Sequence, residues 1–166
     1  RLSQAFPMRG GVLEATLAFP ELTTEVIADG HHLAASLLKT AYRIKGADKL
    51  ALVTDSMRAV DCPDGEYWFG PVGDGELIRR HGDVGVTLDG TGLASGVMGM
   101  DHLVRTMAAA TGAPLHEVIR MASLTPATII GLQDEIGSLG IGKRADLLVL
   151  SKTLEITAIY RDGRIC

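Results

Sequence analysis

The 166-residue sequence is poor in the features that mark secreted, membrane-spanning or nucleic-acid-binding proteins. Its longest apolar stretches, such as 50–53 and 147–150, are far shorter than the roughly 20 residues that a membrane-spanning helix needs. The only two cysteines, Cys62 and Cys166, form no CxxC pair, so a disulfide framework or a zinc ribbon is not supported. With 16 Lys and Arg and a net charge of −4, the chain offers no basic face to a phosphate backbone. We therefore expect a soluble, cytoplasmic protein that binds neither membranes nor nucleic acid.

The composition is instead that of one compact unit. Hydrophobic residues make up 46% of the chain, which is enough to bury one core and too little for two ordinary domains. The chain starts at Arg1 without an initiator Met, and its first residues resemble neither a secretion signal nor a helix start. We expect this start to be a cut through a longer protein.

A strand, a helix and a second strand follow one another near the N-terminus. Residues 24–28 form a short, partly β-branched run, and 49–54 form a near-continuous apolar run that is typical of a parallel strand covered on both faces. Between them, residues 33–44 are apolar at helical spacing, and Gly46 ends the helix. The stripe consists of Leu33, Leu37, Leu38, Ala41 and Ile44. This order, over about 30 residues, predicts a βαβ unit.

The rest of the chain alternates between turn-rich and helical segments. Residues 61–92 are rich in Gly, Asp and Pro, and they predict an insertion of turns and short antiparallel strands. Beyond them the apolar spacing predicts helices at 100–110, 114–122 and 125–131 and strands at 145–150 and 156–160. The Asp162-Gly163 pair predicts the turn of a terminal hairpin.

Polar residues follow both strands of the predicted βαβ unit. Asp29, Gly30, His31 and His32 come after the first strand, and Asp55 comes after the second. In parallel α/β folds, catalytic groups gather at the carboxyl ends of strands, so these residues are candidates for one site. Each feature also has a plainer explanation: Asp55 could cap a helix, and paired histidines in a loop are commonly exposed.

The remaining histidines show no spacing that indicates metal binding. They are His81, His102 and His116, and we expect all three to lie at the surface.

Five blocks of the sequence, in order, resemble successive blocks of the N-acetylglucosamine-6-phosphate deacetylases of the amidohydrolase superfamily. The blocks are residues 25–32, 52–57, 93–101, 121–127 and 137–147. The last, with Gly-Lys-x-Ala-Asp-Leu before a strand, is shared by many amidohydrolases, whereas the first two point more narrowly to the deacetylases.

The resemblance implies an α/β fold in which residues 1–144 are the C-terminal part of a (β/α)8 TIM-type barrel. That part includes the β-rich insertion at about 61–92. Residues 145–166 would supply strands that return to a small β-domain. A homodimer is implied for the full-length parent.

The resemblance also implies roles for the candidate site residues. Asp55 matches the family's catalytic aspartate, which acts as general base on a metal-bound water and then as general acid toward the leaving amine. His32 matches the histidine that contacts the substrate near the reacting amide. The implied substrate-binding residues are Asp29, Gly30, His31, His32, Met98, Gly99 and Met100.

Metal and phosphate recognition depart from the family pattern. The implied cofactor is a divalent metal, zinc or iron, whose ligands are a Glu and two His in earlier blocks that this chain does not contain. The family's Arg-Glu-Pro-Gly block, whose Arg binds phosphate, is replaced here by Met8-Arg9-Gly10-Gly11. Met8 stands at the Arg position and Arg9 lies one residue later, which leaves Arg9 as the candidate phosphate ligand.

The resemblance predicts hydrolysis of N-acetylglucosamine 6-phosphate to glucosamine 6-phosphate and acetate, with the isolated chain inactive. Two alternatives stay open. The substrate could be another N-acetyl amino sugar phosphate, such as N-acetylgalactosamine 6-phosphate. The chain could also be an inactive fragment that only associates with its missing half, since a half-barrel exposes sheet edges and apolar surface.

Overall fold

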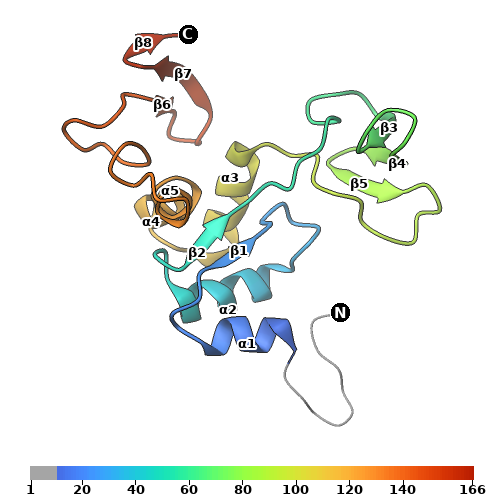
Figure 1. Cartoon of the computed structure of the whole chain (residues 1–166), viewed down its shortest axis with the longest axis horizontal. Coiled ribbons are helices and arrows are strands. Elements are labelled where there is room, and N and C mark those ends of the chain that lie inside the picture. The colour runs from blue at the N-terminus through green and yellow to red at the C-terminus, as the bar shows by residue number, and fades with distance from the viewer. Residues whose placement is uncertain (1–10) are drawn as a thin grey trace.

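Two short parallel strands, β1 (Thr24–Val26) and β2 (Leu50–Leu52), lie side by side in the middle of the molecule (Figure 1). The computed structural model describes residues 11–166, so Arg9 lies outside the described residues. Helix α2 (Ala35–Lys45) connects the two strands, and this confirms the predicted βαβ unit. The register pairs Thr24 with Leu50 and Val26 with Leu52, so both strands end at the same level.

Helices enclose β2 and build the core around it. Helices α3 (Met100–Thr111), α4 (Leu115–Ala122) and α5 (Leu124–Ile129), together with α2, all contact β2. All three residues of β2 are buried, as its continuous apolar sequence predicts. The core cluster consists of Val26, Ala28, Leu38, Ala41, Ala47, Leu50, Leu52, Leu103, Val104, Met107, Val118 and Met121.

The apolar stripe of α2 is only partly buried. Leu38 and Ala41 belong to the core, but Leu37 and Ile44, seven residues apart on one edge of the stripe, are about half exposed. The buried residue in the last turn is Lys45, whose Nζ donates to the carbonyl oxygens of Phe19 (2.6 Å) and Leu22 (3.0 Å). These bonds satisfy the ammonium group and hold the segment after the unpredicted helix α1 (Val12–Ala18).

A second sheet lies within residues 61–92. Strands β3 (Gly65–Phe69), β4 (Glu76–His81) and β5 (Val84–Thr87) form an antiparallel meander in that order. The short antiparallel strands expected in this segment are therefore present. A bridge between Val86 and Leu93, and a hydrogen bond that the Ala94 N–H donates to the Gly85 carbonyl oxygen, join this sheet to the segment that leads into α3.

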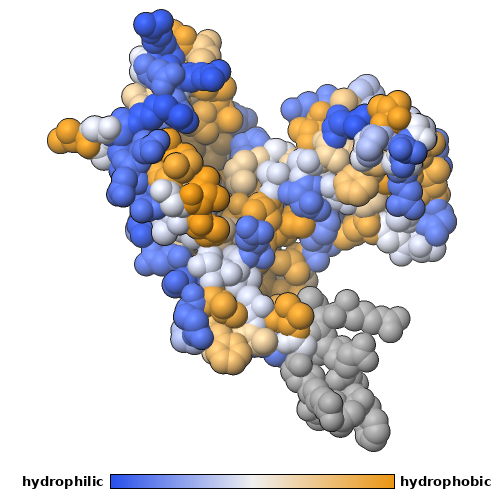
Figure 2. Space-filling model, viewed as in Figure 1, coloured by the Kyte–Doolittle hydropathy of each residue, from blue (hydrophilic) through white to orange (hydrophobic). Residues whose placement is uncertain are grey.

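The C-terminal residues form a third sheet. It contains β6 (Leu147–Leu150), β7 (Ile156–Arg161) and β8 (Arg164–Ile165), paired antiparallel, and Asp162-Gly163 makes the predicted hairpin turn. The sheets β3–β5 and β6–β8 project from the core as separate arms, and apolar surface is visible along the second arm (Figures 1 and 2).

The α/β class expected from the sequence is confirmed, and the element types agree with the predictions where these were made. The helix predicted at 114–122 begins one residue later, at Leu115, because Pro114 is its N-cap and has an extended ψ of 137° rather than a helical one. Within residues 11–166, no helix has the length and apolar content to cross a membrane.

Candidate functional site

The loop after β1 folds around the carboxylate of Asp29. Oδ1 accepts the backbone N–H groups of His31 and His32, each at 2.9 Å, and Oδ2 lies 2.7 Å from Nδ1 of the His32 ring. Because a carboxylate can only accept, Nδ1 carries the proton in this pair. The neutral ring of His32 then has Nε2 as its unprotonated nitrogen, and the pair fixes both the tautomer and the ring orientation.

Asp29 is held in its ionised form by these contacts. Asp29 is only 4% exposed, and burial by itself raises the pKa of its carboxyl group. The hydrogen bonds from the backbone of His32 and His31 and from the His32 ring outweigh burial, so the pKa of Asp29 lies below its usual value. Asp29 therefore acts as a permanent anion beside His32 at neutral pH.

His102 also belongs to this group, contrary to the prediction that it lies free at the surface. It is half-buried in the first turn of α3, and its Nε2 is 3.0 Å from the backbone carbonyl oxygen of Asp29. The position of His102 in the sequence did not indicate this contact, because Asp29 lies 73 residues away in the chain. By contrast, His81 and His116 are exposed, as predicted.

The two adjacent histidines have different partners. While His32 bonds to Asp29, His31 Nε2 lies 3.1 Å from Oδ1 of Asp83 in the turn between β4 and β5. Both side chains of this second pair are substantially exposed, so we expect it to add little stability. It does place the β4–β5 turn next to the loop that contains Asp29, a proximity that the sequence did not indicate.

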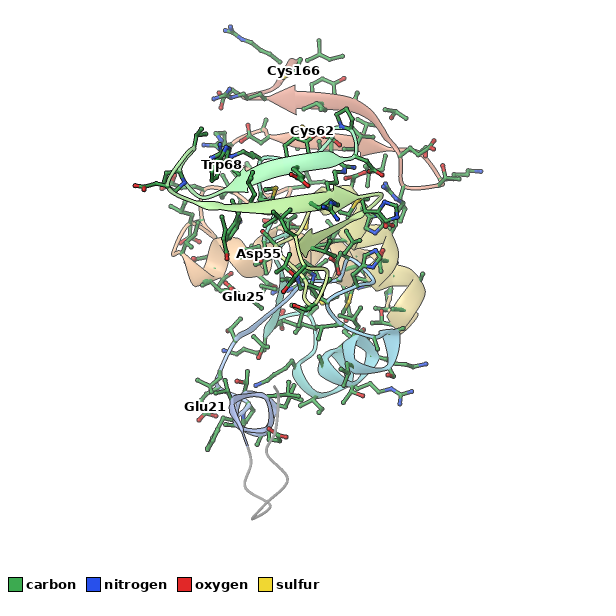
Figure 3. All side chains as sticks on the ribbon, turned by 90° about the vertical axis from the view of Figure 1, so that its right-hand side faces the viewer. Glu21, Glu25, Asp55, Cys62, Trp68 and Cys166 are labelled. Carbon is green, nitrogen blue, oxygen red and sulfur yellow. The ribbon has the colours of Figure 1, made fainter. Side chains whose placement is uncertain are left out.

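Asp55 lies at the same end of the sheet as Asp29. Each aspartate follows its strand by three residues, beyond the paired positions Val26 and Leu52. Asp55 is exposed, and in Figure 3 it lies just below the β3–β5 sheet. The alternative that Asp55 caps a helix is wrong, because the next residue, Ser56, pairs with Gly96 and a turn follows instead of a helix.

The segment before α3 lies against the segment that contains Asp55. The Asp55 carbonyl oxygen accepts the Gly96 N–H (2.8 Å), and Ser56 Oγ donates to the Met98 carbonyl oxygen (2.6 Å). Gly99 is the N-cap of α3, while Met98 and Met100 pack partly buried against the core. The structure thus brings Met98 next to Ser56, the residue after Asp55, and brings His102, in the first turn of α3, next to Asp29.

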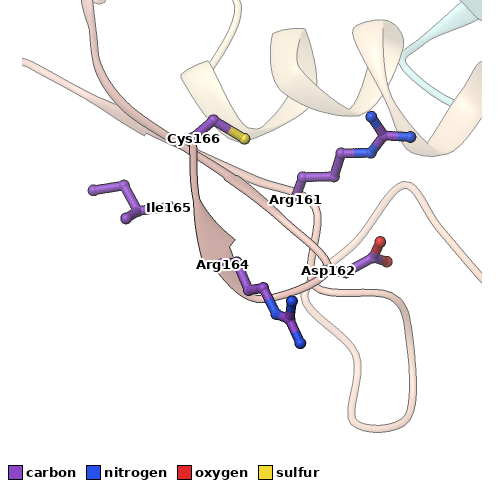
Figure 4. A pocket seen from close by; sticks show the side chains of 5 residues that line it. All are labelled: Arg161, Asp162, Arg164, Ile165 and Cys166. Atoms are coloured by element: carbon purple, nitrogen blue, oxygen red, sulfur yellow. The ribbon is translucent and has the colours of Figure 1, made fainter.

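A metal-binding group and a pocket are two further features that could mark a site in the described residues. Among residues 11–166, no group of three or more His, Cys, Asp or Glu side chains could hold a metal ion. A hollow of about 520 Å³ at the C-terminal hairpin is lined by Arg161, Asp162, Arg164, Ile165 and Cys166, none of which is a predicted site residue (Figure 4).

Comparisons with known proteins place the chain in context. The model of the amidohydrolase family matches residues 2–166. A provisionally named N-acetylgalactosamine-6-phosphate deacetylase of Escherichia coli (strain K12) is 36% identical over 93% of this chain and 89% of its own length. The N-acetylglucosamine-6-phosphate deacetylase of Bacillus subtilis (strain 168) is also 36% identical over 93% of this chain, but over only 38% of its own length.

Solved structures of deacetylases also match the chain. The N-acetylglucosamine-6-phosphate deacetylase of Thermotoga maritima superimposes with a TM-score of 0.84 at 30% identity, covering 93% of this chain and 41% of that chain. An aspartate-to-alanine mutant of the Mycobacterium smegmatis enzyme, in complex with N-acetyl-D-glucosamine-6-phosphate, superimposes with a TM-score of 0.86 at 30% identity. This match covers 94% of this chain and 40% of that chain. The resemblance to these deacetylases is confirmed, and the chain spans about 40% of the length of most of the relatives that it matches.

Proposed function

Because the chain belongs to the amidohydrolase family, we propose that it supplies part of the active site of an N-acetyl amino sugar phosphate deacetylase. The reaction is hydrolysis of the acetamido group to a free amine and acetate. The observation that carries the proposal is the position of Asp55 and of the Asp29–His32 pair at the carboxyl ends of two adjacent parallel strands. The names of the relatives support the substrate class.

Asp55 is the proposed general base and acid. Its side chain is exposed and has no hydrogen-bond partner among the residues that the structure describes, so it is free to take a proton from the attacking water. The same carboxyl group then returns the proton to the amine nitrogen as the C–N bond breaks. A group that must gain and lose a proton in one turnover benefits from having no fixed ion-pair partner.

His32 is the proposed contact to the reacting amide. The bond to Asp29 commits Nδ1, so Nε2 is the ring nitrogen that remains for the substrate. When the ring is protonated, Nε2 donates a hydrogen bond, and the anionic Asp29 stabilises the charge. Such a donor lowers the barrier most if it faces the oxygen on which negative charge develops.

The proposed metal, zinc or iron, has no donor set within the described residues. Its ligands would have to lie elsewhere in the enzyme, and no step above is assigned to it. When bound, such an ion would supply Lewis-acid activation of water or of the amide oxygen.

The proposal extends to the larger architecture. We place β1, β2 and helices α2–α5 in the C-terminal part of a (β/α)8 barrel and β6–β8 in a small β-domain, in an enzyme that works as a homodimer. The carboxyl-end location of the site is what such a barrel requires. Residues 98–100, of which Met98 bonds to Ser56, would contact the sugar, and Arg9 remains the candidate for the phosphate.

The substrate has two candidates because relatives with both names are equally similar, at 36% identity. An assay of the deacetylase that contains this chain on N-acetylglucosamine 6-phosphate and on its galactosamine epimer distinguishes them by kcat/KM. Release of acetate from neither compound would contradict the proposal.

Asp55→Asn tests the proposed role of Asp55 most directly. The amide keeps the shape of the carboxylate but cannot accept the proton, so we expect kcat to fall about 10²–10⁴-fold with little change in substrate affinity. Steady-state rates and substrate binding by calorimetry measure the two effects. Asp61→Asn, an exposed aspartate in the turn that follows, is the matched control and should retain full activity. An Asp55→Asn enzyme with wild-type kcat would remove Asp55 from the chemistry.

A further inference from the structure

Asp55 and its neighbour in space, Ser95, adopt an unusual backbone conformation. Asp55 has φ 47° and Ser95 has φ 66°, in the left-handed region that residues with a Cβ adopt at an energetic cost. Such conformations persist where surrounding contacts impose them, and they concentrate at functional sites. The contacts that impose the Asp55 conformation therefore identify residues that act on it.

Those contacts come from Ser95 and Gly96. The carbonyl oxygen of Asp55 accepts two hydrogen bonds, one from the Ser95 hydroxyl group and one from the Gly96 N–H at 2.8 Å. The Gly96 carbonyl oxygen in turn accepts the Met57 N–H at 3.0 Å. The peptide group that follows Asp55 is thus held at its carbonyl oxygen, and the next peptide group is held at the Met57 N–H.

Gly96 allows the segments to approach this closely. A Cβ added at Gly96 would lie 2.2 Å from the Thr54 carbonyl oxygen, a distance that no side chain tolerates. The glycine therefore brings Ser95 within hydrogen-bonding distance of Asp55.

We propose that Ser95 is a positioning residue for Asp55, whose hydroxyl group holds the Asp55 backbone so that the carboxylate points at the reacting amide. This inference rests on the proposed function. The Asp55 carboxylate has no partner among residues 11–166, so the backbone is the part of Asp55 that the described contacts hold. A fixed Cα–Cβ direction limits where the carboxylate can lie, and small misplacements of a reacting group are costly in rate.

Ser95→Ala removes the hydroxyl group and keeps the Cβ, whereas Ser95→Gly removes the hydroxyl group and also relieves the left-handed strain. We expect both variants to lower kcat about 10- to 100-fold with KM nearly unchanged. Ser123→Ala is the matched control, because Ser123 Oγ also donates to a backbone carbonyl oxygen, that of Ile119 (2.6 Å), but outside the site. Its kcat should equal that of the wild type.

A double-mutant cycle separates positioning from general damage. In the Asp55→Asn background there is no carboxylate to aim, so Ser95→Ala should cause no further loss of the residual rate. A Ser95→Ala effect that persists undiminished in that background would overturn the proposal, as would a wild-type kcat in Ser95→Gly. If the wild type and Ser123→Ala both lack deacetylase activity, the proposed function fails instead, and the two failures are therefore distinguishable.

Discussion

The short strands of the β1–β2 pair lie in the core, whereas the longer strands of the β6–β8 sheet do not. Strands β1 and β2 have three residues each, yet all of β2 is buried and helices cover it. Strand β7 has six residues and pairs on both sides, yet no residue from 128 to 166 is buried. Apolar side chains are present in both regions, including the largely exposed Leu148 and Ile165.

The difference shows that strands can pair regularly without belonging to a packed core. An antiparallel hairpin forms its hydrogen bonds locally, through a turn such as Asp162-Gly163. A parallel pair has no such local closure and exists only where a connecting helix and further helices bury it. Asp29 and Asp55 follow strands whose ends, at Val26 and Leu52, are buried in the core, so the packed core determines their relative placement.

The largest expected effect comes from a core substitution. Leu52→Ala removes a side chain that is 1% exposed, and the cavity should lower the free energy of unfolding by about 3–5 kcal/mol. Leu148→Ala in β6, where the side chain is 57% exposed, should change it by less than about 1 kcal/mol. Urea unfolding of both variants measures this contrast. Equal losses would mean that β6–β8 contributes to a core that these residues do not reveal.

Two glycines give the next contrast. Gly96→Ala would place a Cβ against the Thr54 carbonyl oxygen, so the backbone must shift, at a cost of about 2–3 kcal/mol and with loss of activity through Asp55. Gly163→Ala meets only ordinary contacts, and its φ of +75° costs about 1–2 kcal/mol without touching the site. The midpoint temperature of thermal unfolding and kcat should therefore both fall for Gly96→Ala, whereas only the midpoint temperature should fall for Gly163→Ala. Full activity in Gly96→Ala would contradict the close approach.

The smallest expected effect is on acid stability, at Asp29 and Asp146. Burial raises the pKa of Asp29, but hydrogen bonds from His32 and His31 lower it below its usual value. Hydrogen bonds from the Asp162 backbone and from Arg144 lower the pKa of Asp146. A depressed folded-state pKa adds stability above the unfolded pKa, near 3.9, and this stability is lost as the pH falls through the folded value.

Unfolding midpoints from pH 6 down to pH 2 test this expectation. Asp29→Asn should flatten the acid limb clearly, because the pair is buried, whereas Asp146→Asn should change it little, because the Arg144 pair is exposed and screened by salt. An acid limb that Asp29→Asn leaves unchanged would argue against an ionised Asp29 in the folded state.

Local residue patterns predicted most of the elements but not all of their surroundings. The period of α2 was correct, yet Leu37 and Ile44 are half-exposed while Lys45 is buried, because burial depends on which elements pack against each face. Likewise, Asp29, His32 and Asp55 became candidates through their positions after strands, whereas the contacts of His102 and Ser95 were not foreseen. Their partners are 73 and 40 residues away, and no local pattern encodes such contacts.

By itself the sequence determined the βαβ order, the buried character of β2, the terminal hairpin and the family resemblance. These follow from spacing, turn residues and motif blocks, all of which are properties of short segments. Only the tertiary structure decided that His32 bonds to Asp29 while His31 turns to Asp83, and that Ser95 and Gly96 hold Asp55 in a left-handed conformation. Hydrogen bonds between distant segments form only after the core has brought the strand ends together, so their geometry is a property of the packed chain.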